Sequence, residues 1–236
     1  ILENGLSVDY AESDFINEDV MAEFVFHDFA LDLNKQFFQI ENTYIYSQGI
    51  VNFECDGVYK NKLTSSDSYP VFKTNSHSVN CNIFDTISVV SGIELRGSSF
   101  LFTKKGRGID ILFQDDKMFY NIISNRFELS NNTLSASNSR FVIKNNSDSI
   151  YHPLVNFSYN DYDQKMFIDK ISGGRGLNPV RNTFHGLNMF VDRLEIDLVY
   201  DNCLLFHYAP GTDVDVLFES DTYFDQQRYH DLFSFE

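Results

Sequence analysis

Four carboxylates lie close together near the end of the sequence: Asp213, Asp215, Glu219 and Asp221. Asp213 and Asp215 are two positions apart, and alternate residues of an extended strand point to the same face. Hard oxygen ligands at this density can hold Ca²⁺, although the segment lacks the spacing of an EF-hand loop. We therefore treat the four residues as a candidate calcium site. The competing interpretation is a solvated strand face and turn, because charged side chains usually stay exposed.

A second carboxylate pair, Glu195 and Asp197, alternates with Leu194, Ile196 and Leu198. A glycosidase needs two carboxylates on opposite sides of a sugar. These two share one face of a single predicted strand, and nothing in the sequence brings a partner to them. We therefore assign no catalytic residue, and calcium is the one cofactor that we consider.

Other motifs of catalysis are missing from the sequence. Ser172–Gly176 is rich in glycine but lacks the Lys-Ser/Thr pair of a phosphate-binding loop. The six histidines show no HExxH spacing, and there is no GxSxG nucleophile elbow. The three cysteines, Cys55, Cys81 and Cys203, form no CxxC pair. The sequence thus favours a protein that is not an enzyme.

The composition limits the class of protein. The chain has 236 residues, and 43% of them are hydrophobic, which is enough for a sizeable core. Its net charge of −16 would repel phosphates, so we expect no nucleic-acid partner. No run of about 18 apolar residues is present, so we expect no membrane span. The sequence begins without methionine and ends at Phe233–Glu236 in strand-like alternation, and we expect a piece of a longer chain.

Two regions of the chain differ in their periodicity. Residues 1–23 form an N-terminal segment in which Ser13–Glu23 has the pattern of a short helix. Ser13 is a candidate N-cap, and apolar residues recur every four positions up to Phe24. From there the apolar residues alternate with polar ones, which indicates strands. Residues 24–236 are therefore predicted to be a repetitive all-β region.

Five strand–turn–strand units follow one another in this region. Their turns are centred near residues 34, 75, 116, 163 and 201, and therefore recur about every 40 residues. Phe100, Phe141, Phe190 and Tyr223 follow such turns and would occupy equivalent inward positions. We predict an open β architecture, either a β-solenoid or stacked β-sandwich units of about 40 residues. A five-bladed β-propeller is the alternative, although the chain has no tryptophan.

Three phrases carry a resemblance to a family: SNRFELSNNTLSASNSRFVIKNNS (124–147), FALDLNKQFFQIENTYIYSQG (29–49) and SDSYPVFKTN (66–75). They resemble the repeat units of very large secreted or envelope proteins of Bacteroidota, in which such strand and turn segments recur. The resemblance covers most of residues 24–236. It implies an all-β envelope protein, located outside the cytoplasm, with no assigned catalytic residues.

Together these observations predict a non-enzymatic structural or protein-interaction module of a secreted or cell-envelope protein, in an extracellular or periplasmic location. Its partners would be other protein chains or the remainder of its own chain, recruited by an open strand edge at the C-terminal end. The alternative is a carbohydrate-binding or polysaccharide-degrading β-domain with a glycan partner. Its acidic residues would be Asp213, Asp215, Glu195 and Asp197.

Overall fold

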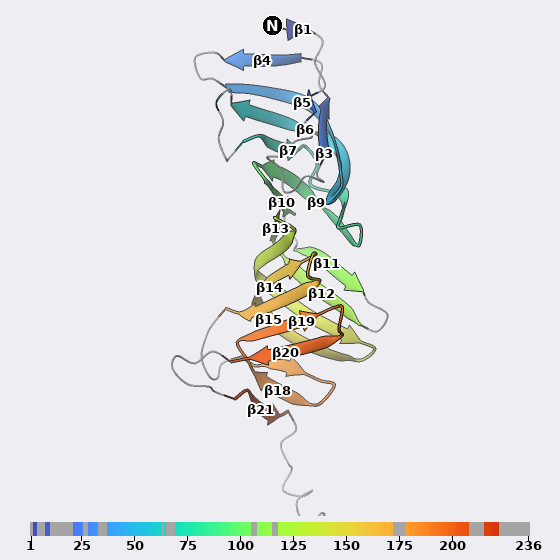
Figure 1. Ribbon diagram of the computed structural model, residues 1–236, viewed down its shortest axis with the longest axis vertical. Helices are drawn as coiled ribbons and strands as arrows, with labels where there is room; N and C mark the ends of the chain where they lie inside the picture. Colours follow the sequence, from blue (N-terminus) through green and yellow to red (C-terminus); the bar gives the residue numbers. More distant parts are fainter. Residues whose placement is uncertain are drawn as a thin grey trace, which may run out of the picture.

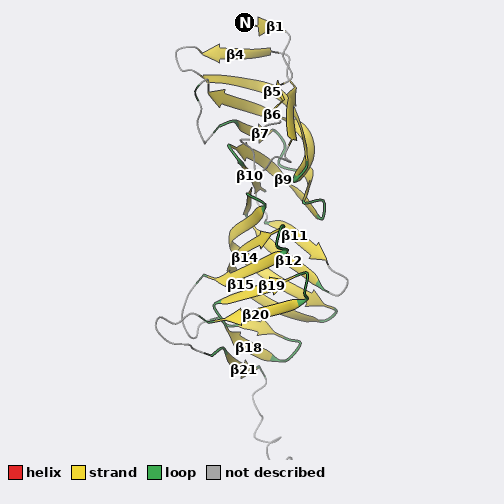
Figure 2. Ribbon diagram, viewed as in Figure 1, coloured by secondary structure: helices red, strands yellow, loops and turns green. Residues whose placement is uncertain are grey.

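A computed structural model describes residues 2–3, 8–9, 21–25, 28–32, 37–62, 64, 69–104, 108–114, 118–171, 178–207 and 215–221. All the regular structure in these ranges is β-strand, and Figure 2 shows no helix there, so the all-β prediction is confirmed. The strands lie across the long axis of an elongated molecule and are stacked along it (Figure 1).

Antiparallel pairs join all the described strands into one 21-stranded sheet. The first nine strands are β1 (Leu2–Glu3), β2 (Val8–Asp9), β3 (Met21–Val25), β4 (Asp28–Asp32), β5 (Phe37–Gln48), β6 (Val51–Lys62), β7 (Val71–Thr74), β8 (Val79–Ile83) and β9 (Ile87–Arg96). The middle of the chain forms β10 (Ser99–Thr103), β11 (Ile109–Gln114), β12 (Phe119–Ser124), β13 (Arg126–Ser130), β14 (Thr133–Asn145) and β15 (Asp148–Asn160). The last strands are β16 (Lys165–Lys170), β17 (Val180–Asn182), β18 (Leu187–Phe190), β19 (Arg193–Asp197), β20 (Asn202–Phe206) and β21 (Leu217–Ser220).

The strand pairs lie in two rows along the molecule. The long strands β5, β6, β14 and β15 take part in both rows. One end of β5 pairs with β4 and the other with β3, and β6 likewise pairs with both β7 and β8. Aromatic rings from the two rows meet in the interior. The ring centroids of Phe113 (β11) and Tyr159 (β15) are 4.8 Å apart, and those of Phe53 (β6) and Phe100 (β10) are 6.0 Å apart. The folded sheet therefore encloses its apolar core between the two rows.

Bulges mark the places where long strands pass from one row to the other. The register of β5 shifts between Ile40 and Thr43, and that of β14 shifts between Ala136 and Ser139. A β-bulge bends its strand and increases the local twist. Thr43 and Ser139 are both fully buried at these bends. The small side chains let the strand turn without filling the core.

The order of strand pairs in the first half of the molecule is repeated in the second. The hairpin β5–β6 is flanked by β3, β4, β7 and β8, as β14–β15 is by β12, β13, β16 and β17. The two consecutive strands β18 and β19 together take the place of the single strand β9, and β20 takes the place of β10. Ile40 and Ala136 are 96 residues apart, and their partners Tyr59 and Phe157 are 98 apart. We call β3–β9 the first unit and β12–β19 the second.

The step of about 40 residues predicted from the sequence is not the period of this pairing. Four of the five predicted hairpins are present as the antiparallel pairs β4–β5, β11–β12, β15–β16 and β19–β20. The fifth turn, near residue 75, joins β7 to β8, which both pair with β6 and β9. The five turns therefore occupy different places in the two units, because pairing with distant strands decides which strands are equivalent.

The aromatic residues predicted to point inward are largely buried but not equivalent. Phe100 and Phe141 are fully buried, and Phe190 is half-buried. Tyr223 lies outside the described residues. Phe100 is on β10, Phe141 on β14 and Phe190 on β18, which have different neighbours in the two rows. Alternation predicted their burial, but it could not predict their equivalence.

The helix predicted at Ser13–Glu23 is wrong at its C-terminal end. Met21–Glu23 belong to strand β3, which pairs with β5. A partner strand more than twenty residues away overrides a weak local pattern here. Residues 13–20 lie outside the described residues. Strand β3 also runs across residue 23, where the sequence pattern separated the two regions.

Gly57 of β6 is a position where the two units pack differently. A Cβ at Gly57 would come within 2.4 Å of the Phe72 ring and of a backbone carbonyl oxygen. In the second unit, Val155 has the place of Gly57 and Ile168 has that of Phe72. A small residue with a large neighbour thus corresponds to a larger residue with a smaller neighbour, which conserves the core volume.

We expect Gly57→Val to lower the free energy of unfolding by about 1–3 kcal/mol, because it overpacks the core against Phe72. Phe72→Ile alone should also destabilise the protein by leaving a cavity. The double variant should lose less than the sum of the two losses, by about 1 kcal/mol. Urea unfolding followed by circular dichroism measures all three values. Losses that simply add would contradict this account of the packing.

Candidate functional site

Strand β19 carries the second carboxylate pair, and its alternation is as predicted. Leu194 and Ile196 are buried in the core, while Glu195 and Asp197 occupy the alternate positions. Lys165 of β16, thirty residues earlier, lies opposite them. Its Nζ donates to Glu195 Oε1 over 2.7 Å and lies 3.8 Å from Asp197 Oδ2. The hydrogen bond to Glu195 raises the pKa of Lys165. The Lys165 ammonium group thus forms ion pairs with both carboxylates.

Asp197 also closes the turn that follows β19. Its Oδ1 accepts hydrogen bonds from the backbone N–H groups of Val199 and Tyr200, both over 3.0 Å. A carboxylate that binds the backbone two and three residues later stabilises a tight turn. Asp197 is only 6% exposed. The pair that the sequence offered as glycosidase carboxylates is thus engaged in an ion pair and a turn.

The candidate calcium residues are only partly covered by the structure. Asp213 lies outside the described residues, and Asp215 and Glu219 are exposed. Asp221 Oδ2 accepts hydrogen bonds from Arg181, over 2.7 Å from Nη2 and 3.2 Å from Nε. Among the described residues, no three His, Cys, Asp or Glu side chains form a group that could hold a metal ion. Calcium binding by the four carboxylates stays a prediction, and Asp221 already has a cationic partner.

A histidine–aspartate pair was missed by the sequence analysis. His207 Nδ1 lies 2.7 Å from Asp192 Oδ2, and both side chains are about one-tenth exposed. Asp192 sits in the break between β18 and β19, and His207 follows β20. No sequence spacing could have found the pair, because the adjacent backbones are brought together by the β19–β20 hairpin. A His–Asp pair can move a proton, but it does not define a reaction without a nucleophile.

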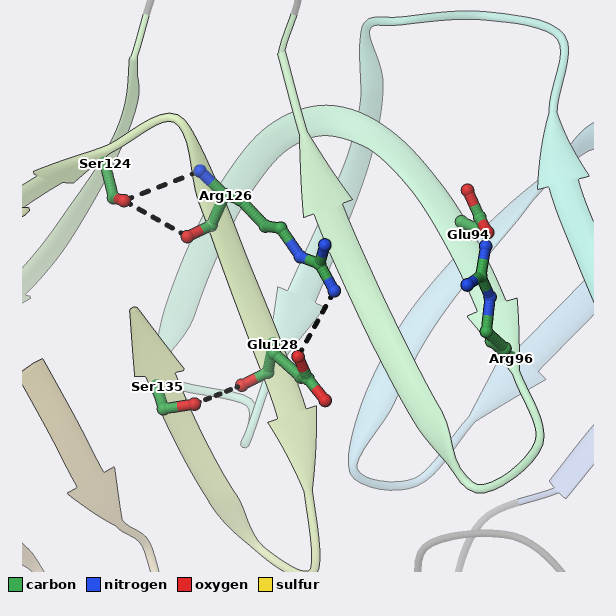
Figure 3. A network of polar contacts seen from close by, with 6 residues as sticks. All are labelled: Glu94, Arg96, Ser124, Arg126, Glu128 and Ser135. Carbon is green, nitrogen blue, oxygen red and sulfur yellow. Dashed lines mark hydrogen bonds and ion pairs between the residues drawn. The ribbon is translucent and has the colours of Figure 1, made fainter. Parts of the chain in front are cut away.

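A polar groove of about 420 Å³ lies beside the bulge of β14. Its network is drawn in Figure 3: the Ser124 hydroxyl lies 3.1 Å from the carbonyl oxygen of Arg126, and Arg126 Nη2 donates to Glu128 Oε2 over 3.3 Å. Ser135 Oγ donates to the carbonyl oxygen of Glu128. The groove is lined by Ser124, Asn125, Arg126, Glu128, Ser135, Ala136, Ser137 and Asn138. Its donors, acceptors and two opposite charges suit a polar ligand such as a sugar.

A similar ion pair lies two strands away on the same face. Arg96 donates to Glu94 on β9, and β10 separates this pair from Arg126 and Glu128 on β13 (Figure 3). Lys73 of β7 is in register with Glu94. Exposed ion pairs of this kind contribute at most about 1 kcal/mol each. The face therefore carries alternating charges rather than a field of one sign.

Comparisons with protein-family models, with curated proteins and with solved structures find no match to this chain. Within the described ranges there is also no helix that is long and apolar enough to cross a membrane.

We expect Asp197→Ala to lower the free energy of unfolding by about 1–3 kcal/mol, because two backbone donors lose their acceptor. Glu195→Gln should cost less than about 1 kcal/mol, since its ion pair with Lys165 is partly exposed. Urea unfolding at neutral pH compares the two variants with the unmodified protein. An Asp197→Ala variant as stable as the unmodified protein would show that the turn does not depend on this carboxylate.

His152 of β15 is a buried titratable group with two backbone partners. Its Nδ1 accepts from the backbone N–H of Leu154 over 3.2 Å, and its Nε2 lies 3.1 Å from the carbonyl oxygen of Asn178. Because Nδ1 accepts, the single proton of the neutral ring is on Nε2, where it can be donated to that carbonyl. Burial lowers the pKa of His152 from its usual value of 6.5.

The unfolded chain protonates His152 at a higher pH than the folded chain does. Folding stability is therefore lost as the pH falls below about 6.5, towards the lower pKa of the folded state. We expect His152→Gln to reduce the fall in unfolding free energy between pH 7 and pH 5. His185→Gln, at an exposed position, is the control and should keep the fall. Equal pH dependence in both variants would exclude His152 as its source.

Proposed function

We propose that this chain is a non-enzymatic structural or protein-interaction module of a secreted or cell-envelope protein. The observation that carries the proposal is the repeated order of strand pairs along the long axis. Each unit encloses apolar residues between its two rows, and β10 and β11 join one unit to the next along the axis, as neighbouring units are joined in stacked repeat proteins. We infer that the architecture is a stack of folded-over β units of nearly 100 residues, intermediate between a β-solenoid and stacked sandwiches.

The positions of the charged groups support this proposal. Glu195 and Asp197 are held by Lys165 and a turn, and Asp221 is held by Arg181. Side chains with such partners contribute to the stability and solubility of a surface. Carboxylates that are already paired are poorly suited to act as a catalytic acid or nucleophile. The resemblance to large envelope proteins of Bacteroidota agrees with an extracellular or periplasmic location.

The location can be tested with an antibody against the protein in the cells that make it. We expect the antigen in the medium or the envelope fraction, and we expect protease added to intact cells to remove a surface-exposed form. A cytoplasmic enzyme serves as the control for cell integrity. Antigen confined to the cytoplasmic fraction would refute the proposed location.

A carbohydrate-binding role is the second candidate, and the polar groove beside β14 favours it. We expect a glycan array to give no signal that depends on the groove. If a glycan binds, Arg126→Ala should abolish the signal and Arg181→Ala, on a different strand, should leave it unchanged. Such a result, or release of sugar that is lost in Glu195→Gln, would replace the structural proposal by the carbohydrate one.

A further inference from the structure

Strands β20 and β21 follow the second unit as β10 and β11 follow the first, and they occupy equivalent places. β20 pairs with β19 as β10 pairs with β9, and β21 pairs with β18 while β11 lies beside β9. In the middle of the molecule, β10 and β11 each have another neighbour. β10 pairs with β13 over four residue pairs, and β11 pairs with β12 over six. Among the described residues, β20 pairs only with β19 and β21 only with β18.

The sequence supports this equivalence. Ile109–Tyr120 reads IDILFQDDKMFY, and Val214–Asp225, 105 residues later, reads VDVLFESDTYFD. Identical residues occupy five of the twelve positions, and isoleucine is replaced by valine at two more. In β20, Leu205 pairs with Leu194 as Phe100 of β10 pairs with Leu95, and Phe100 and Leu205 are also 105 residues apart. Two independent features, pairing and sequence, thus give one alignment.

Equivalent side chains of β10 and β11 and of β20 and β21 differ in burial. Phe113 of β11 is 8% exposed and packs against Phe157 and Tyr159 of the second unit. Its counterpart Phe218 of β21 is 46% exposed. On β20, Leu205 is half-buried, whereas Phe100 is fully buried. Strands β20 and β21 therefore expose apolar residues whose counterparts on β10 and β11 are buried.

The N-terminal end has the complementary strands. β3 and β4 correspond to β12 and β13, the neighbours that β11 and β10 have in the middle. At this end, β2 pairs with β3 where β11 would pair with β12, and β1 pairs with β4 where β10 would pair with β13. Strands β1 and β2 form only two residue pairs each. Strands β20 and β21, with five and four residues, could form more hydrogen bonds with β4 and β3 than the two-residue strands β1 and β2 do.

We propose that the end formed by β20 and β21 binds the β3–β4 end of a second copy of this chain, displacing β1 and β2 of that copy. The proposal rests on the proposed function, because it names the partner of the interaction module. The contact joins two different surfaces and does not close, so it forms linear head-to-tail oligomers. Strand addition supplies backbone hydrogen bonds along the edges, and the second copy covers Phe218.

Sedimentation velocity of the full chain over a range of concentrations tests this proposal. We expect a series of oligomers that grows with concentration. Phe218→Asp should weaken the association at least tenfold, because it places a charge in the buried contact. Leu112→Asp is the matched control, since Leu112 is 55% exposed on β11 and corresponds to Leu217, the neighbour of Phe218. It should leave the association unchanged. Circular dichroism confirms that both variants are folded.

Removal of residues 1–9 is a second test with the opposite sign. It deletes β1 and β2, so we expect it to strengthen the association of copies that carry intact β20 and β21. A protein that stays monomeric at every concentration would overturn the proposal, as would dimers that do not grow or equal effects of Phe218→Asp and Leu112→Asp. None of these results would alter the cell-fractionation result, so the proposed location is judged separately.

Discussion

Antiparallel pairing along the two rows is the constraint on which the rest of the structure depends. Each strand must find partners for its backbone N–H and C=O groups, because groups left unpaired in the interior are costly. The long strands satisfy this requirement in both rows, and the bulges near Thr43 and Ser139 let them do so. With the backbone fixed in this way, alternate side chains of each row face the enclosed core. Strands β10 and β11 then connect the two units, because β10 pairs with both β9 and β13, and β11 pairs with β12.

The same constraint determines where the charge of the chain lies. Inward positions are mostly apolar, so most acidic residues whose burial the structure describes lie on outer faces and in turns, while Asp192 and Asp197 are buried. Several of them then pair with a basic residue on the same strand or on a neighbouring one, as Asp169 does with Arg193. Pairing across strands adds modest stability and helps to fix register. It also gives Glu195 and Asp197 of β19 a shared cationic partner in Lys165.

Local features of the fold were predictable from the sequence, and its long-range features were not. Alternation at Leu194–Asp197 predicted which side chains face inward, and acidic or Asn-rich turns predicted four hairpins. The partners of Glu195 and Asp192 could not be predicted, because Lys165 and His207 reach them through strand pairing. For the same reason the helix pattern before Phe24 was misleading. The match between Ile109–Tyr120 and Val214–Asp225 is a sequence signal of the longer spacing, and its step of 105 residues is close to the 96 and 98 residues between paired positions of β5–β6 and β14–β15.

Strands β20 and β21 repeat an edge that, in β10 and β11, is covered by further strands. Hydrogen–deuterium exchange of the backbone amides tests this claim most directly, because it reports the protection of each strand. In dilute solution the account predicts faster exchange in β20 and β21 than in β10 and β11, and protection of β20 and β21 that rises with protein concentration. Exchange in β20 and β21 that is as slow as in β10 and β11, at every concentration, would contradict it.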